Sequence, residues 1–190
     1  MMKTHDGQTI LIRRAEVADA TEIAQVRVLS WRASYRGIIA QKVLDGLSVV
    51  ETSRWIEASI QRNAPGSCRL VAQEPSGQIV GFALGGLERT RDPEYDGELY
   101  AIYLLPDFMR MGVGRRLLLS MAECLLQQGM HAMLIWVLAE NPARKFYEAL
   151  GGVYVREQPV TIGPDALPEV AYGWRDLEAL IHSSKADNRA

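Results

Sequence analysis

The segment from Glu98 to Arg116 constrains the fold most, because a strand there is predicted to run through a glycine-bearing turn into a helix. The predicted strand covers 98–105 and ends before Pro106, which cannot donate to a strand ladder. The helix is predicted from Gly112 to Gln128, with Val113, Leu117, Met121 and Leu125 on one apolar stripe, and Gly129 is placed to end it.

The turn itself carries Gly112-Val113-Gly114 within the stretch from Met109 to Arg116. Glycine lets the backbone approach a ligand closely, and the first N–H groups of a helix have no partner within the helix. The helix dipole and three arginines (Arg110, Arg115 and Arg116) add positive charge. Two interpretations follow from the residues alone: a cradle for pyrophosphate, or a plain helix start with solvated arginines.

The remaining periodicities predict a single α/β domain. Helices dominate the first third, a meander of strands follows, and helix then alternates with strand, which favours a mixed sheet between helix layers. We expect one domain over 1–182 and a polar, disordered tail over 183–190. Strands are predicted at 8–13, 69–74, 79–87, 132–138, 152–157 and 167–174, and helices from Asp19, from Gln41, from a capping motif at Ser48, and over 142–150.

Composition excludes several classes of protein. With 190 residues and a net charge of −2, the chain has no general basic field for nucleic acid or an anionic membrane. Cys68 and Cys124 are far apart and lack CxxC spacing, so we expect neither a disulfide framework nor a thiolate metal site. The first residues lack the apolar core of a signal peptide, and no apolar run spans a bilayer, so the cytoplasm is the expected location.

Two phosphate-binding motifs fail on the glycine turn. A dinucleotide fingerprint requires a third glycine where this chain has Leu117, and a Walker A loop requires GxxxxGK before Ser or Thr. A generic nucleotide-binding domain is therefore a weak alternative.

A second motif lies downstream, from Asn141 to Gly152, where an Asn precedes a short helix that carries Tyr147 and ends in Leu-Gly. Together, the two motifs resemble those of the GCN5-related N-acetyltransferase (GNAT) superfamily, in the family's order and separation. The family's signature has Gln or Arg where this chain has Met109, which is a departure. No substrate follows from the resemblance.

The resemblance implies a mostly antiparallel mixed sheet flanked by helices, with the fourth and fifth strands splayed. It also implies an acetyl-CoA-dependent N-acetyltransferase that moves the acetyl group to a primary amine by direct attack in a ternary complex, without a metal. The residues it assigns to the cofactor are Ile102, Tyr103, Leu104, Met109, Arg110, Met111, Gly112, Val113, Gly114, Arg115, Asn141 and Tyr147.

Tyr147 is the candidate general acid, because a phenol with a pKa near 10 can protonate a departing thiolate. Strand alternation predicts that Glu98 shares a face with Tyr100, Ile102 and Leu104, where it would be the base. A solvated strand end is the alternative for Glu98, and Asp96, Glu94 or a water chain are alternative bases. Periodicity alone allows Tyr147 to be a core residue and Asn141 to be only a helix cap.

The acceptor is expected to contact Trp31, Tyr35 and Glu98, with Arg32 and Arg36 nearby to hold a carboxylate. Packing of Trp31 against the sheet is the alternative, and Trp136 is predicted to be a core residue. Cys124 is a poor candidate for an acyl carrier, since it lies in a leucine-rich helix.

The expected partner is a small-molecule or peptide amine, and a homodimer is left open. The competing functional hypothesis is a non-catalytic acyl-CoA-binding or regulatory module of the same fold, which Met109 favours.

Overall fold

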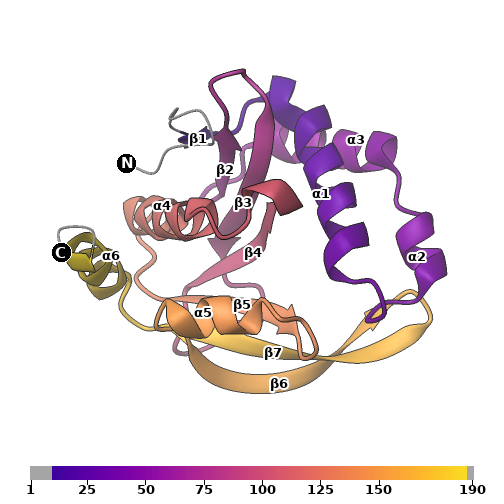
Figure 1. The fold of residues 1–190 in the computed structure, drawn as a ribbon. Coiled ribbons are helices and arrows are strands. Elements are labelled where there is room, and N and C mark those ends of the chain that lie inside the picture. The colour runs from indigo at the N-terminus through magenta and orange to yellow at the C-terminus, as the bar shows by residue number, and fades with distance from the viewer. Residues whose placement is uncertain (1–9, 188–190) are drawn as a thin grey trace.

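The computed structural model describes residues 10–187, which form one seven-stranded sheet with helices on both faces (Figure 1). The strands are β1 (Leu11–Arg14), β2 (Cys68–Gln73), β3 (Ile79–Leu87), β4 (Gly97–Leu104), β5 (Met133–Leu138), β6 (Val153–Ile162) and β7 (Asp165–Trp174). The α-helices are α1 (Ala20–Ser34), α2 (Gln41–Asp45), α3 (Val49–Arg62), α4 (Val113–Gln127), α5 (Arg144–Ala149) and α6 (Leu177–Asp187), with short 3-10 turns at Val17–Asp19 and Pro106–Phe108.

The strand order is β1-β2-β3-β4-β5-β7-β6, and every neighbouring pair is antiparallel except β4 and β5. Helices α1 and α3 lie on one side of the sheet, whereas α4, α5 and α6 lie on the other (Figure 1). The predicted mixed, mostly antiparallel α/β sheet is confirmed.

Helix α4 supplies the core of one face. Its predicted stripe of Val113, Leu117, Met121 and Leu125 is buried against the sheet. Each fully buried Leu contributes about 2 kcal/mol of hydrophobic free energy. The helix ends at Gln127, and Gly129 follows its cap with a φ of 84°, a left-handed conformation that glycine adopts without strain, so the predicted stop at this glycine is confirmed.

The start of the helical layer on the other face differs in detail from the prediction. Asp19 precedes α1 but makes no cap hydrogen bond to it. Its carboxylate instead accepts hydrogen bonds from both terminal nitrogens of Arg13, at 2.7 and 2.8 Å. The Ser48 prediction is confirmed, because its Oγ accepts a hydrogen bond from the N–H of Glu51 at 3.2 Å.

The β6–β7 hairpin is longer than the sequence predicted, with ten residues in each strand. It forms one edge of the sheet and extends toward α2 (Figure 1). Its Val160, Ile162 and Leu167 pack on a small cluster that includes Tyr35 and Leu44. This contact ties the end of the hairpin to the α1–α2 region.

The predicted disordered tail is wrong for residues 183–187. Helix α6 runs from Leu177 to Asp187, because Leu177, Leu180 and Ile181 bury a face in the cluster around α4. Residues 188–190 lie outside the described residues, as do residues 8 and 9 of the first predicted strand.

A disulfide joins Cys68 at the start of β2 to Cys124 in α4, with their Cα atoms 6.0 Å apart. The expectation that these cysteines form no disulfide framework is therefore wrong. Their separation of 56 residues gave no local signal, and only the packing of α4 across β2 brings them together.

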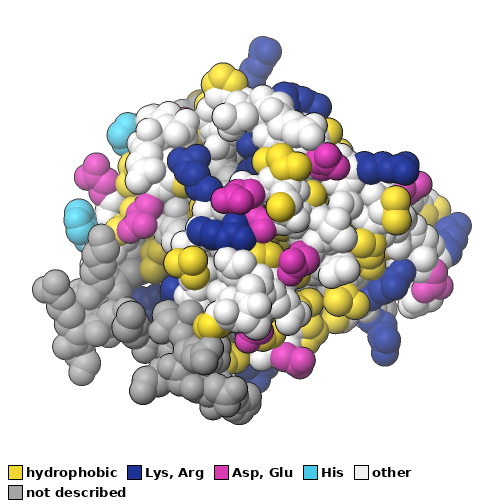
Figure 2. All heavy atoms as spheres, turned by 90° about the horizontal axis from the view of Figure 1, so that it is seen from above, with side chains coloured by type: hydrophobic (Ala, Val, Ile, Leu, Met, Phe, Trp, Pro, Cys, Tyr) yellow, Lys and Arg dark blue, Asp and Glu magenta, His cyan; other side chains and the backbone are white. Residues whose placement is uncertain are grey.

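No helix within residues 10–187 is long and apolar enough to cross a membrane. On the face seen in Figure 2, lysine and arginine side chains are interspersed with aspartate and glutamate side chains. This mixture agrees with the small net charge of −2.

Replacing both cysteines with alanine should destabilise the fold by about 4 kcal/mol. A cross-link that closes a loop of this length lowers the conformational entropy of the unfolded chain by an amount worth that free energy. Urea denaturation with and without dithiothreitol measures it. Reductant should lower the midpoint of the wild type and leave that of the Cys68→Ala/Cys124→Ala variant unchanged. A wild-type urea midpoint that is the same with and without dithiothreitol would contradict the disulfide.

Candidate active site

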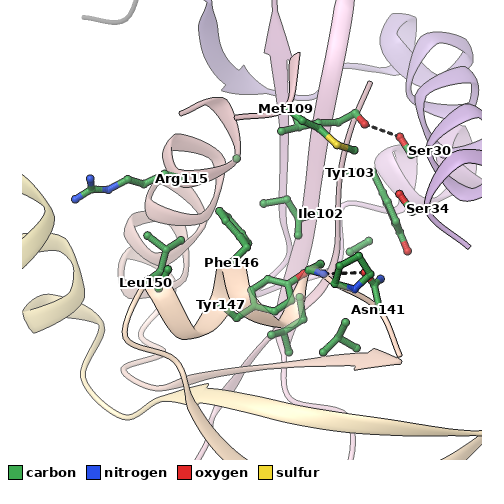
Figure 3. Close-up of a pocket in the computed structure, with 18 of the residues that line it drawn as sticks. Ser30, Ser34, Ile102, Tyr103, Met109, Arg115, Asn141, Phe146, Tyr147 and Leu150 are labelled. Atoms are coloured by element: carbon green, nitrogen blue, oxygen red, sulfur yellow. Dashed lines mark hydrogen bonds between the residues drawn. The ribbon is translucent and has the colours of Figure 1, made fainter. Parts of the chain in front are cut away.

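The site lies where β4 and β5 diverge. The two strands pair only at Gly97 with Met133 and at Glu98 with Leu134. Beyond that point a cavity of about 690 Å³ opens between them. Its walls include α1 residues on one side of the sheet and α4 and α5 residues on the other, so the cavity passes through the sheet (Figure 3). The predicted splay of the fourth and fifth strands is confirmed.

A β-bulge in β4 decides which side chains face the helices. Leu84 pairs with Ala101 and Gly85 pairs with Leu99, so Tyr100 has no partner in β3. Such an extra residue shifts the alternation of side chains by one position. After the bulge, Ile102 and Leu104 pack with the α4 cluster, whereas Tyr103 packs with the cluster on the α1 side.

The same register leaves part of the β4 backbone open to the cavity. The Leu105 N–H donates to Val80 on β3 at 2.9 Å, whereas the Leu104 carbonyl accepts from Ser30 Oγ at 2.8 Å. Since backbone groups alternate between the two sides of a strand, those of Ile102 and Leu104 face away from β3. The backbone of Tyr103 faces β3, where it pairs with Phe82, so the prediction of a Tyr103 backbone contact is wrong.

The glycine turn presents backbone donors to one end of the cavity. Gly112, with a φ of 73°, caps α4, and Arg110 also has a positive φ of 58°. The Arg116 N–H closes the first turn onto the Gly112 carbonyl at 3.1 Å. The N–H groups of Gly112, Val113 and Gly114 have no backbone partner among the described residues, so this end is suited to an anion.

The arginines of the turn differ from one another. Arg110 lines the cavity. Arg116 does not contribute charge there, because its guanidinium donates to the Ile10 carbonyl at 2.7 Å. Arg115 borders the cavity, but its side chain extends away from the other labelled side chains (Figure 3).

Tyr147 projects from α5 into the cavity wall (Figure 3). Only 5% of the residue is exposed, and its ring packs against Phe146, Tyr172 and Trp174. Its hydroxyl forms no hydrogen bond to any other described residue. Burial, followed by the influence of Tyr103, raises the pKa of Tyr147, so the phenol is protonated at neutral pH.

Asn141 has two roles. Its Oδ1 accepts a hydrogen bond from the Ala143 N–H at 2.9 Å, which fixes the entry into α5, and the residue also lines the cavity. Burial and the neighbouring Tyr103 raise the pKa of Tyr35, and the Asn141 amide opposes that shift to a smaller extent.

Aromatic residues line the α1 side of the cavity. The Tyr35 and Tyr103 hydroxyls are 3.2 Å apart and hydrogen-bonded to each other. Trp31 packs against both rings but does not itself line the cavity. Trp136 lines the cavity from β5, contrary to the prediction that it is only core, and its buried indole N–H has no partner among the described residues.

Glu98 is not placed as a base. Its side chain is fully buried and does not line the cavity. Both carboxylate oxygens accept hydrogen bonds from the Arg89 guanidinium, and Oε2 also accepts from the Arg89 backbone N–H at 3.2 Å. The prediction of shared alternation with Ile102 and Leu104 is wrong because the bulge at Tyr100 lies between them.

The alternative loop carboxylates and Arg32 are engaged elsewhere. Asp96 accepts hydrogen bonds from the backbone N–H groups of His131 and Ala132, and Glu94 pairs with Arg175. Arg32 donates to the carbonyls of Leu44 and Leu47, so it holds the α1–α2 connection in place.

The sequence did not identify Tyr100, Phe146, Ser30 or Arg89 as neighbours of the site. Phe146 and Ser30 lie on helices whose cavity-facing side depends on how each helix docks. The position of Tyr100 depends on the β-bulge, and that of Arg89 depends on the loop after β3; neither feature gives a periodic signal in the sequence. Trp136 alternates with Ile135, and Ile135 packs toward α4, so strand alternation could have placed Trp136 on the opposite face.

Comparisons with known proteins agree with this geometry. Residues 80–159 match the family model described as FR47-like protein. The chain is 41% identical over 172 residues to the uncharacterized N-acetyltransferase YuaI of Bacillus subtilis, covering 90% of this chain and 96% of YuaI.

Two solved structures share the fold. PaiA N-acetyltransferase from Thermoplasma acidophilum, solved with coenzyme A, is 21% identical with a TM-score of 0.64, covering 85% of this chain and 98% of its own. YncA from Salmonella typhimurium, solved with acetyl-CoA as its cofactor, is 22% identical with a TM-score of 0.66, covering 89% and 94%.

The fold and the cavity between diverging strands thus define an acyl-group transferase. The chain belongs to the GCN5-related N-acetyltransferase superfamily, and it is an N-acetyltransferase.

Glu98→Gln should lower turnover by less than about tenfold, whereas loss of a general base would lower it by about 100- to 10,000-fold. Arg89→Ala should destabilise the fold by about 2 kcal/mol, because it leaves a buried carboxylate without its donor. Initial rates and urea denaturation measure the two effects. A Glu98→Gln variant with native stability and almost no turnover would restore Glu98 as the base.

Proposed function

We propose that the enzyme binds acetyl-CoA from the α4–α5 side of the sheet and transfers the acetyl group directly to a primary amine that enters from the α1 side. The observation that carries this proposal is a cavity that passes through the sheet. At one end lie helix amides with no backbone partner among residues 10–187, and the Tyr147 hydroxyl lies in the wall.

The donor would extend along three successive parts of the cavity. The N–H groups of Gly112, Val113 and Gly114 would hold the pyrophosphate, supported by the charge of Arg110. The open backbone groups of Ile102 and Leu104 would hydrogen-bond the amides of the pantetheine arm. A Cβ added at Gly114 would lie 3.4 Å from side-chain atoms of Leu104 and Phe146, so position 114 lies directly beside two side chains that line the cavity.

The transfer requires one new bond and one broken bond. The amine nitrogen attacks the thioester carbonyl carbon, and the C–S bond then breaks with its electron pair on sulfur. The Tyr147 hydroxyl would give its proton to that thiolate, and the proton lost by the nitrogen would restore the phenol. The products are the N-acetylated acceptor and the free thiol of coenzyme A.

Direct attack is favoured over an acyl-enzyme because Cys124, the cysteine of α4, is held in the disulfide with Cys68. The non-catalytic alternative is weaker, since a buried phenol in the cavity wall makes no hydrogen bond among the described residues. Such a hydroxyl contributes little to stability and suits a proton transfer.

Gly112→Ala should weaken acetyl-CoA binding at least about tenfold, because a Cβ at positive φ strains the turn and displaces its amides. Gly129→Ala is the matched control, since Gly129 ends the same helix at a φ of 84°. Isothermal titration with acetyl-CoA gives the dissociation constants. Equal losses in the two variants would contradict the cradle.

Tyr147→Phe should lower kcat by about 10- to 10,000-fold and leave the dissociation constant of coenzyme A nearly unchanged. The raised pKa keeps the phenol protonated as pH rises, so wild-type kcat should not fall on approaching about pH 10, the ordinary tyrosine value. Stopped-flow or thiol-release assays across pH measure both effects. Unchanged kcat in the variant would remove Tyr147 from the mechanism.

A further inference from the structure

The α1 side of the cavity, here called the acceptor half, is walled by Ser34, Tyr35, Tyr100, Tyr103 and Trp136. Its use by an acceptor rests on the proposed function, because the helix amides on the other side would be occupied by the donor. Hydroxyl groups and aromatic rings dominate this wall. The ligands that this wall can recognise depend on the charged groups that pack against its side chains.

Arginines pack against two of these aromatic rings and against Trp31, which lies next to the wall. The Arg89 guanidinium lies 4.6 Å from the centre of the Tyr100 ring, and Arg156 lies 5.2 Å from the centre of the Trp136 ring. Arg27 lies 4.7 Å from the ring of Trp31, which packs against Tyr35 and Tyr103. These rings therefore already hold a cation on one face, which disfavours a second cation in the acceptor half.

The carboxylates around the acceptor half are also engaged. Glu98 is paired with Arg89, and Asp92 is paired with Arg156. Glu169 accepts a hydrogen bond from Gln158 at 2.8 Å. An ammonium group entering the cavity would have to compete with Arg89 and Arg156 for the charges of Glu98 and Asp92.

The hydroxyl pair offers suitable contacts to a neutral amine. The Tyr35 and Tyr103 oxygens are held 3.2 Å apart by the rings of Trp31 and Phe82. One hydrogen joins the two oxygens, and each hydroxyl oxygen keeps acceptor capacity. A neutral primary amine could donate its N–H groups to them and keep its lone pair for attack on the thioester.

The β6–β7 hairpin bounds the acceptor half on the α2 side. The cluster that contains Tyr35 also contains Leu138 from β5, and the end of the hairpin packs on it. A Cβ added at Gly163 would lie 2.4 Å from Val43 of α2, so the two segments are in close contact. This enclosure favours a small molecule over a side chain on a folded protein surface.

We propose that the acceptor is a small, weakly basic primary amine on an apolar or aromatic body, bound in its neutral form, with Tyr35 and Tyr103 accepting hydrogen bonds from its N–H groups. Neutral binding also explains why the cavity wall needs no general base. The proton leaves nitrogen only after attack, and Tyr147 is then available to receive it.

An acceptor panel at constant acetyl-CoA tests the charge preference. Phenylalanine amide and phenethylamine share an aromatic body, but the α-amine has a pKa near 8 and the alkylamine one near 10. At pH 7, kcat/KM should be at least about 50-fold higher for phenylalanine amide, and the ratio should shrink as pH approaches 10. Phenethylamine or 1,4-diaminobutane as the better substrate at pH 7 would overturn the proposal.

Substitution of the hydroxyl pair tests the residues. Tyr35→Phe and Tyr103→Phe should each raise the KM of phenylalanine amide about five- to tenfold, the effect of one lost hydrogen bond, and leave the dissociation constant of acetyl-CoA within about twofold. Tyr154→Phe removes an exposed phenol outside the cavity and should change neither value. An unchanged acceptor KM in the Tyr35→Phe/Tyr103→Phe variant would overturn the assignment.

Two outcomes distinguish a wrong acceptor from a wrong donor site. Absence of acetyl-CoA binding in calorimetry would refute the donor site and with it the proposed function. Tight acetyl-CoA binding with fastest turnover of cationic amines would leave the proposed function intact and refute the neutral acceptor alone.

Discussion

The divergence of β4 from β5 is the constraint on which the site depends. Two residue pairs hold the strands together at one end, and beyond them β4 and β5 form no ladder hydrogen bonds, which leaves room for the cavity. Backbone groups left without a strand partner inside a protein need another partner. In this chain, Ser30 satisfies the Leu104 carbonyl, and the Leu104 N–H and the backbone groups of Ile102 on the open side remain available to a ligand. In the cavity, backbone groups of β4 that would otherwise pair with a neighbouring strand are free to hydrogen-bond a ligand.

The bulge at Tyr100 makes that divergence productive. If the same residues formed a regular strand without the bulge, Glu98 would point to the same side as Ile102 and bring a charge into the wall of the cavity. With it, the carboxylate is buried against Arg89 on the other side, and no carboxylate among the described residues lines the passage. A one-residue irregularity therefore separates the charged part of β4 from the part that faces the proposed thioester.

Local signals predicted the α4–α5 side of the cavity well. The apolar stripe of α4, the glycine at its start and the Tyr147 motif each depend on spacing within a few residues, and the structure places all three as expected. The acceptor side was less predictable. The role of Glu98 depends on the β-bulge, and the exposure of Trp136 to the cavity depends on which face of β5 meets which helix. The Cys68–Cys124 bond depends on contacts between residues 56 positions apart. Such features arise from tertiary packing and leave no periodic trace.

The docking of the β6–β7 hairpin on α2 has an evolutionary consequence. The donor side of the passage is built mainly from a continuous stretch between β4 and α5, whereas the acceptor half is closed by segments from near the two ends of the chain. Changes in the hairpin or in α2 can therefore reshape the entrance without disturbing the helix amides of α4. A lineage of such enzymes could diversify its acceptors by drift in these peripheral segments while its donor chemistry stays constant.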